Sequence, residues 1–412
     1  MRFVRKKPLG TKALTAFSIA IACGYFFGAM MFTPSLPAIA NYFDTNSSLT
    51  RMTVSSFFIT MALSQLIYGP ASDKYGRKPI ILLGSIIFAL GSLSCFVSQS
   101  ITFLIISRAI QGFGVGALIT LAKTVVQDSF TKEQFLKVVA WMSIFFSMAP
   151  AISPVIGGFF QVHFGWQASF VFMFIFAIVL SIFIIFLFPE TNKEKNHKAM
   201  HINHLIRSYL TITKNKMFWT YMILNISALS GGVIFDVIGS FILIDDYHLT
   251  AATFGIISTL LMVVMIFSRI LMSALISSNI KKEIILLLGL FMMSSACVVL
   301  GILYLSNLIN LVNLLILFGL FCLGCGFILP ISSASALSLF DNMKGIAGSF
   351  YGSIQMGGVF LVSIIASSLQ PSIGFMLSIL SILSFISLLI GIKTFYKQSG
   401  IFNFKDKTTQ LI

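Results

Sequence analysis

Charged residues are scarce in this sequence, and acidic residues are the scarcest. Only 9% of the 412 residues are Asp, Glu, Lys or Arg, while 57% are hydrophobic. A soluble domain carries roughly a quarter charged residues, so this chain has too few charges to cover a soluble surface of its size. The shortage excludes a soluble enzyme, a disordered chain and a DNA-binding domain, and it leaves a polytopic membrane protein.

Nucleotide, redox and metal motifs are also missing. The sequence holds no G-x-x-x-x-G-K-[ST] loop, which excludes an ATP-driven pump. Its five cysteines all fall in hydrophobic stretches, and Cys322 and Cys325 are interpreted as small packing residues. His201 and His204 lie in a basic polar segment, for which a solvated linker is a better interpretation than a metal site. The sequence therefore predicts no cofactor and no metal.

Long apolar stretches are what the chain has in abundance. A membrane-spanning helix needs about 20 apolar residues. The stretches predict twelve such helices, near residues 12–36, 50–71, 79–97, 102–125, 137–161, 167–188, 218–243, 251–277, 284–305, 310–335, 345–369 and 371–392.

One polar stretch, 189–216, divides these spans into six and six. It predicts an N-terminal six-helix half over 1–191, a cytoplasmic basic linker over 192–216, and a C-terminal six-helix half with a short cytoplasmic tail over 217–412. Two such halves joined by a linker are typical of repeat-built transporters that work by alternating access. The expected fold class is an all-α membrane protein with two pseudo-symmetric halves.

Positive charge is unevenly placed along the chain. The formal net charge is +15, from 27 Lys and Arg against 12 Asp and Glu, which in a soluble protein would suggest nucleic acid. Nearly all Lys and Arg residues outside the predicted spans lie on one side, and Arg51 is the exception. This bias predicts a multi-pass inner-membrane protein with both termini in the cytoplasm. The expected partners of the basic loops are anionic lipids, not nucleic acid.

A charged tight turn lies between the second and third predicted spans, where residues 69–78 read GPASDKYGRK. Gly69 and Pro70 are expected to break the second span, and Gly76 permits a positive φ. Arg77 and Lys78 are expected to anchor the start of the third span at the lipid headgroups.

This run resembles the G-x-x-x-D-x-x-G-R-[RK] signature of the major facilitator superfamily. The resemblance implies a conformational gate that latches the outward-open state. In that gate the loop carboxylate lies near a helix N-terminus of the other half, where the helix dipole favours an anion, and the loop arginine pairs with an acidic residue at the end of the fourth span. The residues implied are Gly69, Asp73, Gly76, Arg77 and Lys78, with Asp128 as the acidic partner.

The fourth predicted span contains a charge, where residues 107–117 read SRAIQGFGVGA. A charge at the centre of a membrane helix costs about 2.5 kcal/mol or more and is usually functional. Arg108 and Gln111 share one helix face. The run resembles the R-x-x-Q-G-x-G motif of facilitator antiporters, which implies proton coupling for Arg108. The alternative is a structural polar tie to the first or second span. Arg269 in the eighth span ranks lower, because it is expected to snorkel toward the cytoplasm.

The fifth predicted span is bent and closely packed, because residues 149–158 read APAISPVIGG. The run resembles the antiporter motif of 12-span drug:proton exporters, whose kinked helix packs on the eighth span and is thought to limit leak. The residues implied are Pro150, Pro154, Gly157 and Gly158. With the later runs GWQASF and PET, the chain is most similar to the bicyclomycin-resistance-like (Bcr/CflA) branch.

Met30 stands where that branch has an intramembrane aspartate in its first span, and Asp236 is the one acidic residue inside a predicted span. Spans 1 and 7 are repeat-equivalent, and the two positions lie at matching depth. We therefore hypothesise that the acidic site has moved to the other half. Asp236 would carry the proton or bind a cationic group of the substrate. The alternative is a structural carboxylate, hydrogen-bonded to a neighbouring helix or paired with Arg108.

The expected activity is secondary active transport, not enzymatic catalysis. We expect a monomer that exports a lipophilic drug-like or metabolite substrate in exchange for protons. A specialised metabolite or siderophore transporter of the same fold is the alternative, and a non-transporting membrane sensor is a further one. The expected cavity residues are polar, aromatic or sulfur-containing side chains of the inward-facing spans: Tyr25, Met30, Gln65, Gln111, Asn225 and Gln355.

Overall fold

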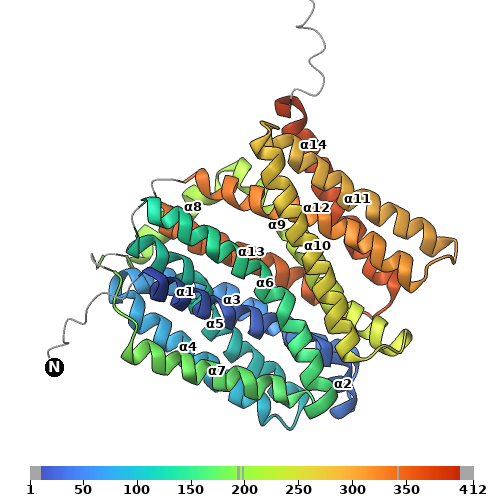
Figure 1. Ribbon diagram of the computed structural model, residues 1–412, viewed down its shortest axis with the longest axis horizontal. Coiled ribbons are helices and arrows are strands. Elements are labelled where there is room, and N and C mark those ends of the chain that lie inside the picture. Colours follow the sequence, from blue (N-terminus) through green and yellow to red (C-terminus); the bar gives the residue numbers. More distant parts are fainter. Residues whose placement is uncertain (1–10, 131, 193–194, 197–198, 341–342, 400–412) are drawn as a thin grey trace, which may run out of the picture.

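The structure is a computed structural model that describes residues 11–399, apart from 131, 193–194, 197–198 and 341–342 (Figure 1). Within these residues the chain forms helices and connecting turns, without a β-strand. The all-α architecture expected from the composition is therefore confirmed.

The first group of helices is interrupted once near its start, where Pro34 and Pro37 lack a backbone N–H and break the helix. Its elements are α1 (Thr11–Met30), the short turn η1 (Thr33–Ser35), α2 (Leu36–Tyr42), α3 (Ser47–Tyr75), α4 (Arg77–Phe96), α5 (Ile101–Ser129), α6 (Lys132–Phe164) and α7 (Gln167–Phe186). The expected break at Gly69 and Pro70 is wrong, because α3 continues through both residues to Tyr75.

The second group follows a linker that contains the short helix α8 (Ile202–Thr213). Its elements are α9 (Lys216–Ile234), the π-helical segments η2 (Phe235–Gly239) and η3 (Ile242–Asp246), α10 (Ala251–Ser277), α11 (Lys282–Leu305), α12 (Leu311–Ser338), α13 (Lys344–Ser368) and α14 (Ile373–Ser399).

Side-chain caps begin several helices at one end of the bundle. Asn46, Ser100 and Thr250 each accept a hydrogen bond from the backbone N–H three residues later, at the start of α3, α5 and α10. Asn310 forms a reciprocal capping box with Asn313 at the start of α12. These caps satisfy N–H groups that have no partner inside the helix.

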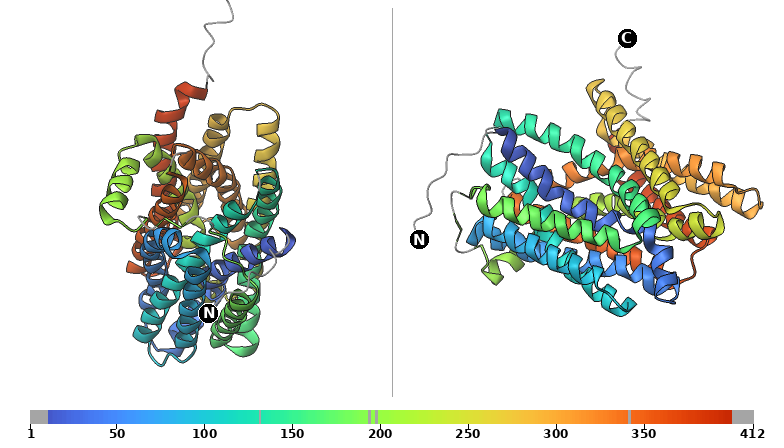
Figure 2. Two further views of the ribbon diagram at one scale, coloured as in Figure 1. Left: turned by 90° about the vertical axis from the view of Figure 1, so that its left-hand side faces the viewer. Right: turned by 60° about the horizontal axis from the view of Figure 1, so that its bottom comes forward.

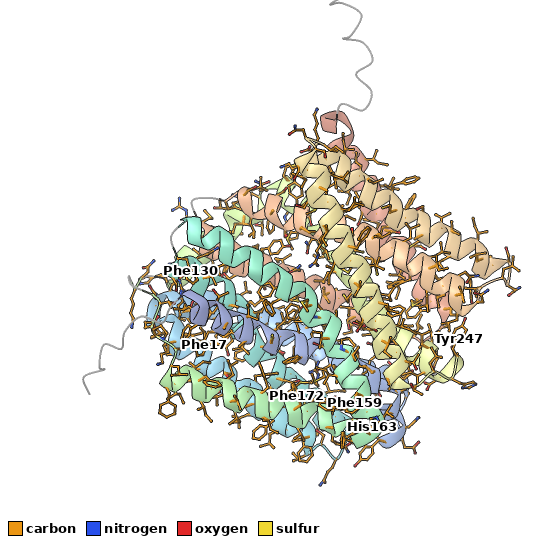
Figure 3. The ribbon with its side chains drawn as sticks, viewed as in Figure 1. Phe17, Phe130, Phe159, His163, Phe172 and Tyr247 are labelled. Atoms are coloured by element: carbon orange, nitrogen blue, oxygen red, sulfur yellow. The ribbon has the colours of Figure 1, made fainter. Side chains whose placement is uncertain are left out.

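The helices are long and apolar enough for a membrane. Among the described residues, eleven helical segments meet this requirement, and they correspond to eleven of the twelve spans expected. The twelfth, 137–161, lies within the single helix α6, several of whose side chains fall outside the description. Large apolar side chains such as Phe159, Phe291 and Val298 are exposed, and Phe159 is labelled in Figure 3. An outer surface this apolar is suited to lipid.

Two apolar cores divide the molecule. One consists mainly of side chains from α1 to α7 and the other of side chains from α9 to α14. Figure 2 shows the two groups side by side from two further directions. The exact boundaries of the halves, at 191/192 and 216/217, remain predictions.

The bundle has two ends, which we name for their loops. The basic end carries the turn at Gly76 and the linker helix α8; the opposite end carries the caps at Asn46 and Thr250. In Figure 3, Phe130 lies at the basic end and Tyr247 at the opposite end.

The two halves are joined more closely at the opposite end. There Thr259 Oγ1 of α10 donates to the Ala151 carbonyl of α6, and Gly255 approaches the Pro154 backbone. Toward the basic end α6 and α10 diverge (Figure 1). The wedge between them holds the cavity described next.

Candidate functional site

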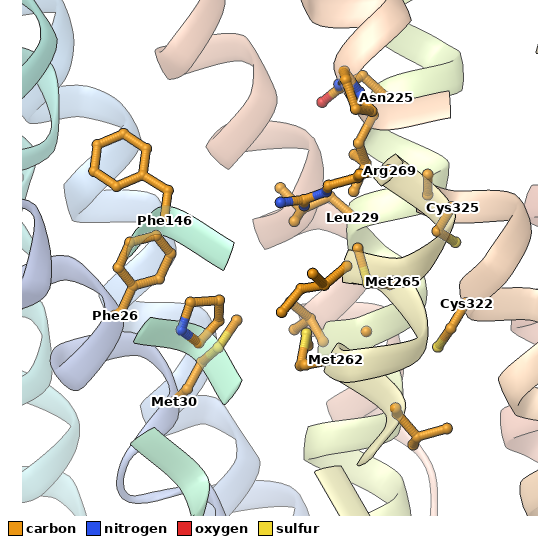
Figure 4. A pocket seen from close by; sticks show the side chains of 18 of the residues that line it. Phe26, Met30, Phe146, Asn225, Leu229, Met262, Met265, Arg269, Cys322 and Cys325 are labelled. Atoms are coloured by element: carbon orange, nitrogen blue, oxygen red, sulfur yellow. Dashed lines mark hydrogen bonds between the residues drawn. The ribbon is translucent and has the colours of Figure 1, made fainter. Parts of the chain in front are cut away.

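A cavity of about 1010 Å³ lies between the two halves (Figure 4). Its wall from the first half is mainly apolar, with Phe26, Met30 and Phe146 facing the gap. Its charged lining residues, Asp236 and Arg269, both belong to the second half. Both walls thus carry aromatic and other apolar side chains, whereas both charged lining residues belong to the second half.

Asp236 lies in the cavity wall within the π-helical segment η2. Its neighbour Phe235 points into the core, stacked on Phe318 at 4.5 Å and on Phe254 at 6.0 Å. Asp236 itself is 5% exposed, and no described residue donates a hydrogen bond or forms an ion pair with its carboxylate. A buried carboxylate without a protein partner has its charge uncompensated. π segments inside α-helices are frequent at functional sites.

Met30 and Asp236 line the same cavity from opposite halves. This is the arrangement expected if spans 1 and 7 are repeat-equivalent. The proposed transfer of the acidic site from position 30 to position 236 stays a prediction.

A polar cluster extends the second wall. Gln355 Nε2 of α13 donates to Asn225 Oδ1 of α9 at 2.5 Å, and Asn225 Nδ2 donates to Ser332 Oγ of α12 at 3.0 Å. Gln355, Asn225 and Tyr25, three of the predicted cavity residues, line the cavity, and their contact with a solute stays a prediction. The cluster holds three helices in a fixed relation and presents amide groups to a bound solute.

Arg269 also lines the cavity, and its guanidinium points into the gap in Figure 4. Sequence reasoning gave this residue a lower rank than Arg108. Position along the helix alone did not show which face of α10 Arg269 occupies.

Arg108 is placed differently, inside the first half and fully buried. It is not among the cavity-lining residues. Its Nη1 donates to the Gly28 carbonyl of α1 at 2.9 Å, and its Nε donates to the Thr53 carbonyl of α3 at 3.4 Å. Its guanidinium lies 4.0 Å from the Phe32 ring centroid and 4.3 Å from that of Phe57. These contacts are those of a polar tie between spans 4, 1 and 2, whereas its proton-coupling role stays a prediction.

Gln111 and Gln65 likewise lie outside the cavity lining. Gln111 accepts a hydrogen bond from Arg108 Nη1 and donates from Nε2 to Ser92 Oγ at 2.7 Å. Gln65 is buried where α3 meets α13, and its Oε1 occupies the space that a Cβ at Gly352 would need. Both were predicted as cavity residues because they are polar side chains on spans expected to face inward, which does not tell which neighbouring helix covers them.

The charged turn forms a compact ionic cluster at the basic end. Arg77 Nη1 binds Asp73 Oδ1 at 2.5 Å, and Arg77 Nε binds Asp128 Oδ2 at 2.8 Å. Lys78 Nζ donates to the Ile185 carbonyl at 3.0 Å. Gly69 packs closely against Ser349 of α13, which brings the start of the turn to the other half. The structure thus brings the expected gate residues together, and their gating role stays a prediction.

Glu190 completes this cluster, and sequence reasoning did not assign it there. Its carboxylate accepts hydrogen bonds from the backbone N–H groups of Arg77 at 2.8 Å and Lys78 at 3.2 Å. It thereby caps the first turn of α4, where an anion is favoured by the helix dipole. Gly76 has φ +112°, and a Cβ there would clash with the Glu190 carboxylate. The available signal was an acidic residue directly after the sixth span.

The proline and glycine run of α6 lies at the contact between the halves. Pro154 and Gly158 approach Gly255 and Ala251 of α10, Gly157 packs on the Met31 carbonyl, and Pro150 lines the cavity. The glycines permit these approaches because they have no Cβ. The contact between spans 5 and 8 is present, whereas its role in limiting leak stays a prediction.

Residues 18–367 match the sequence profile of the Major Facilitator Superfamily. The chain belongs to this superfamily. It is therefore a membrane transporter and not an enzyme.

Two superfamily relatives carry drug-resistance names. The chain is 31% identical over 351 residues to the bicyclomycin resistance protein homolog of Haemophilus influenzae, a match that covers 83% of this chain and 85% of that protein. It is 25% identical over 387 residues to multidrug resistance protein D of Escherichia coli, covering 92% and 95%. The expected drug-efflux group of the superfamily is confirmed.

Solved structures share the superfamily fold at low sequence identity. A D-xylose-proton symporter superposes with a TM-score of 0.73 at 14% identity, covering 92% of this chain and 97% of that chain. The partially occluded inward-open xylose transporter XylE of Escherichia coli gives 0.72 at 13%, covering 93% and 97%. The expected facilitator fold is confirmed.

Proposed function

We propose that this protein is a proton-coupled exporter of lipophilic drug-like or metabolite compounds in the inner membrane. The observation that carries the proposal is the cavity between the halves, in which Asp236 is the only carboxylate among the described lining residues. A proton and a cationic or polar solute would compete for this carboxylate. Alternation of the two halves would then exchange them across the membrane. The resistance names of the two relatives support the substrate class.

The charge bias assigns the two ends of the bundle. Lys and Arg concentrate in the loops of the basic end, so this end would face the cytoplasm together with both termini. The cavity then opens toward the cytoplasm and is sealed toward the outside. The basic linker and its amphipathic helix α8 would lie against anionic headgroups. No contact of the described chain requires a second copy, and we propose a monomer.

The cytoplasmic cluster would work as the gate. Arg77 draws Asp73 and Asp128 together within one half, and Gly69 touches α13 of the other half. In the outward-open state the Asp73 carboxylate would move to a helix N-terminus of the second half, where the dipole favours it.

A specialised metabolite or siderophore transporter is the second candidate, favoured by Met30. Replacing the usual acidic residue of the first half changes the charge that a substrate meets, and a dedicated solute could need such a change. The range of solutes that the protein exchanges separates the two candidates.

The test is solute exchange in proteoliposomes with and without an imposed pH gradient, using bicyclomycin and a set of lipophilic drugs as probes. We expect gradient-driven transport by the unaltered protein and its loss in Asp236→Asn, with gradient-independent counterflow retained. Ser295→Ala, at a position of α11 outside the cavity lining, serves as the control. Gradient-driven transport that persists in Asp236→Asn would overturn the carrier role. Absence of exchange with every drug, but export of a single metabolite, would favour the second candidate.

A further inference from the structure

Arg51 is the exception in the charge distribution, because it lies at the opposite end of the bundle, away from the other loop cations. It belongs to the second turn of α3 and is fully buried. A long cationic side chain at a membrane surface normally extends into water. A buried one implies that protein groups replace its hydration.

The groups that receive the Arg51 side chain belong largely to the other half. Its Nη1 donates to the Ala366 carbonyl at 2.6 Å, and its Nη2 donates to the Leu369 carbonyl at 2.5 Å. Its Cζ lies 5.8 Å from the ring centroid of Phe241, which lies between the π-helical segments η2 and η3. Within its own helix, Nε donates to the Ser47 carbonyl at 3.0 Å. One side chain of the first half thus touches two helices of the second.

The acceptors form a helix end. α13 ends at Ser368, and the last carbonyls of a helix have no partner within it and carry the negative end of its dipole. The planar guanidinium donates to two such carbonyls at once, a geometry that a lysine ammonium does not reproduce. No described carboxylate lies within ion-pair distance of Arg51, so this helix end is its main counter-charge.

Two neighbouring contacts continue the seal along α3 and α13. Ser48 Oγ donates to the Ser367 carbonyl, and the hydroxyls of Ser55 and Ser363 lie 2.8 Å apart. The bonds from Arg51 to Ala366 and Leu369, like the contacts of Ser48 and Ser55, cross between the halves. All would break if the halves separated at this end.

We infer that Arg51 is the external latch of the transport cycle, which holds the opposite end closed while the cavity is open at the basic end. The inference rests on the proposed alternating-access function. Separation of the halves would leave the guanidinium without acceptors and the end of α13 without a cap, so the latch favours one state over the other. The Arg77 cluster at the basic end differs, because its ion pairs lie within one half.

The test measures which end is open by cysteine labelling. Ser363→Cys places a reporter inside the external seal, and Met265→Cys places one in the cavity. Both are labelled with a membrane-impermeant maleimide, the first in intact cells and the second in inside-out vesicles. The parent protein, with its five cysteines, gives the blank.

We expect Arg51→Gln to raise labelling of the external reporter severalfold and to lower labelling of the cavity reporter. Arg51→Lys should give labelling between that of the parent protein and that of Arg51→Gln. It keeps the positive charge but loses the planar guanidinium that donates to two carbonyls at once. Ser100→Ala is the matched control, since it removes a helix cap at the same end whose hydrogen bond lies within its own helix. It should leave both reporters unchanged.

Two results would overturn the inference. Unchanged labelling in a monodisperse Arg51→Gln protein would show that Arg51 only caps the end of α13 and does not act as a latch. An equal rise at both reporters would indicate general loosening. Because labelling needs no substrate, these results are distinguishable from failure of the proposed transport function, which would show in solute exchange alone.

Discussion

Arg77 donates from Nε to Asp128 Oδ2 at 2.8 Å, which joins the start of α4 to the end of α5. The same side chain reaches Asp73 through Nη1, so a single guanidinium holds two carboxylates at the basic end. Asp128 is partly exposed, with 25% of its side chain accessible, and water screens part of the attraction.

Asp128→Asn tests this pair. The substitution keeps the shape of the side chain and removes its charge, so we expect a modest loss of stability, about 1 kcal/mol or less. Transport should fall severalfold, because Arg77 is released from its fixed position. Melting temperature and solute exchange measure the two effects. Equal transport at equal membrane levels would contradict the gating role.

Gly76→Ala should destabilise the protein by about 1–3 kcal/mol. The residue has φ +112°, and the added Cβ meets the Glu190 carboxylate, which must then leave the start of α4. Thermal unfolding in detergent measures the loss. Gly301→Ala in α11, where a Cβ meets no atom within 4 Å, is the control and should be neutral or slightly stabilising. Equal melting temperatures for the two variants would show that neither the φ nor the close approach matters.

Gly158→Ala should open a leak. The glycine approaches the Ala251 carbonyl of the other half, and a Cβ would push α6 and α10 apart at the end where they seal the cavity. We expect faster decay of an imposed pH gradient in proteoliposomes without substrate. Gly319→Ala in α12, a position outside the cavity lining with no atom within 4 Å of the added Cβ, is the comparison. A decay rate equal to that of the parent protein would show that the close approach of α6 at Gly158 does not limit proton leak.

Met30→Asp combined with Asp236→Asn tests the transfer of the acidic site. Both positions line one cavity from opposite halves, so the double variant restores a carboxylate to the site on its other wall. We expect it to regain part of the gradient-driven transport that Asp236→Asn alone loses. No recovery, in a variant that folds and still performs counterflow, would show that the carboxylate must lie on the second-half wall of the cavity.

Local features of the fold and site were predictable from the sequence. Apolar length predicted the spans, and the family resemblance implied that Asp73 and Arg77 belong to one gate. The acidic partner Asp128 followed from the family resemblance. The lining position of Asp236 followed from the cost of an isolated charge in a membrane.

Long-range relations were not predictable in the same way. The acceptors of Arg51 lie more than 300 residues away along the chain, and the Glu190 cap is separated from Arg77 by 113 residues. Gln65 and Gln111 were predicted as cavity residues because they are polar and lie on spans expected to face inward. That expectation did not distinguish the interior of one half from the cavity between the halves, because neighbouring helices cover side chains in both places.

The π-helical segments η2 and η3, which continue α9, can each hold one residue more than an α-helical turn would. A π turn closes over i→i+5 instead of i→i+4 and so holds an extra residue. If η2 tightened to α geometry, everything beyond it would rotate by roughly 100° and advance by about 1.5 Å. Phe241, which lies between the two segments, would then leave its position over Arg51. A change at the Asp236 carboxylate would then reach the contacts of Arg51 as a screw motion of one helix, without any relay of side chains.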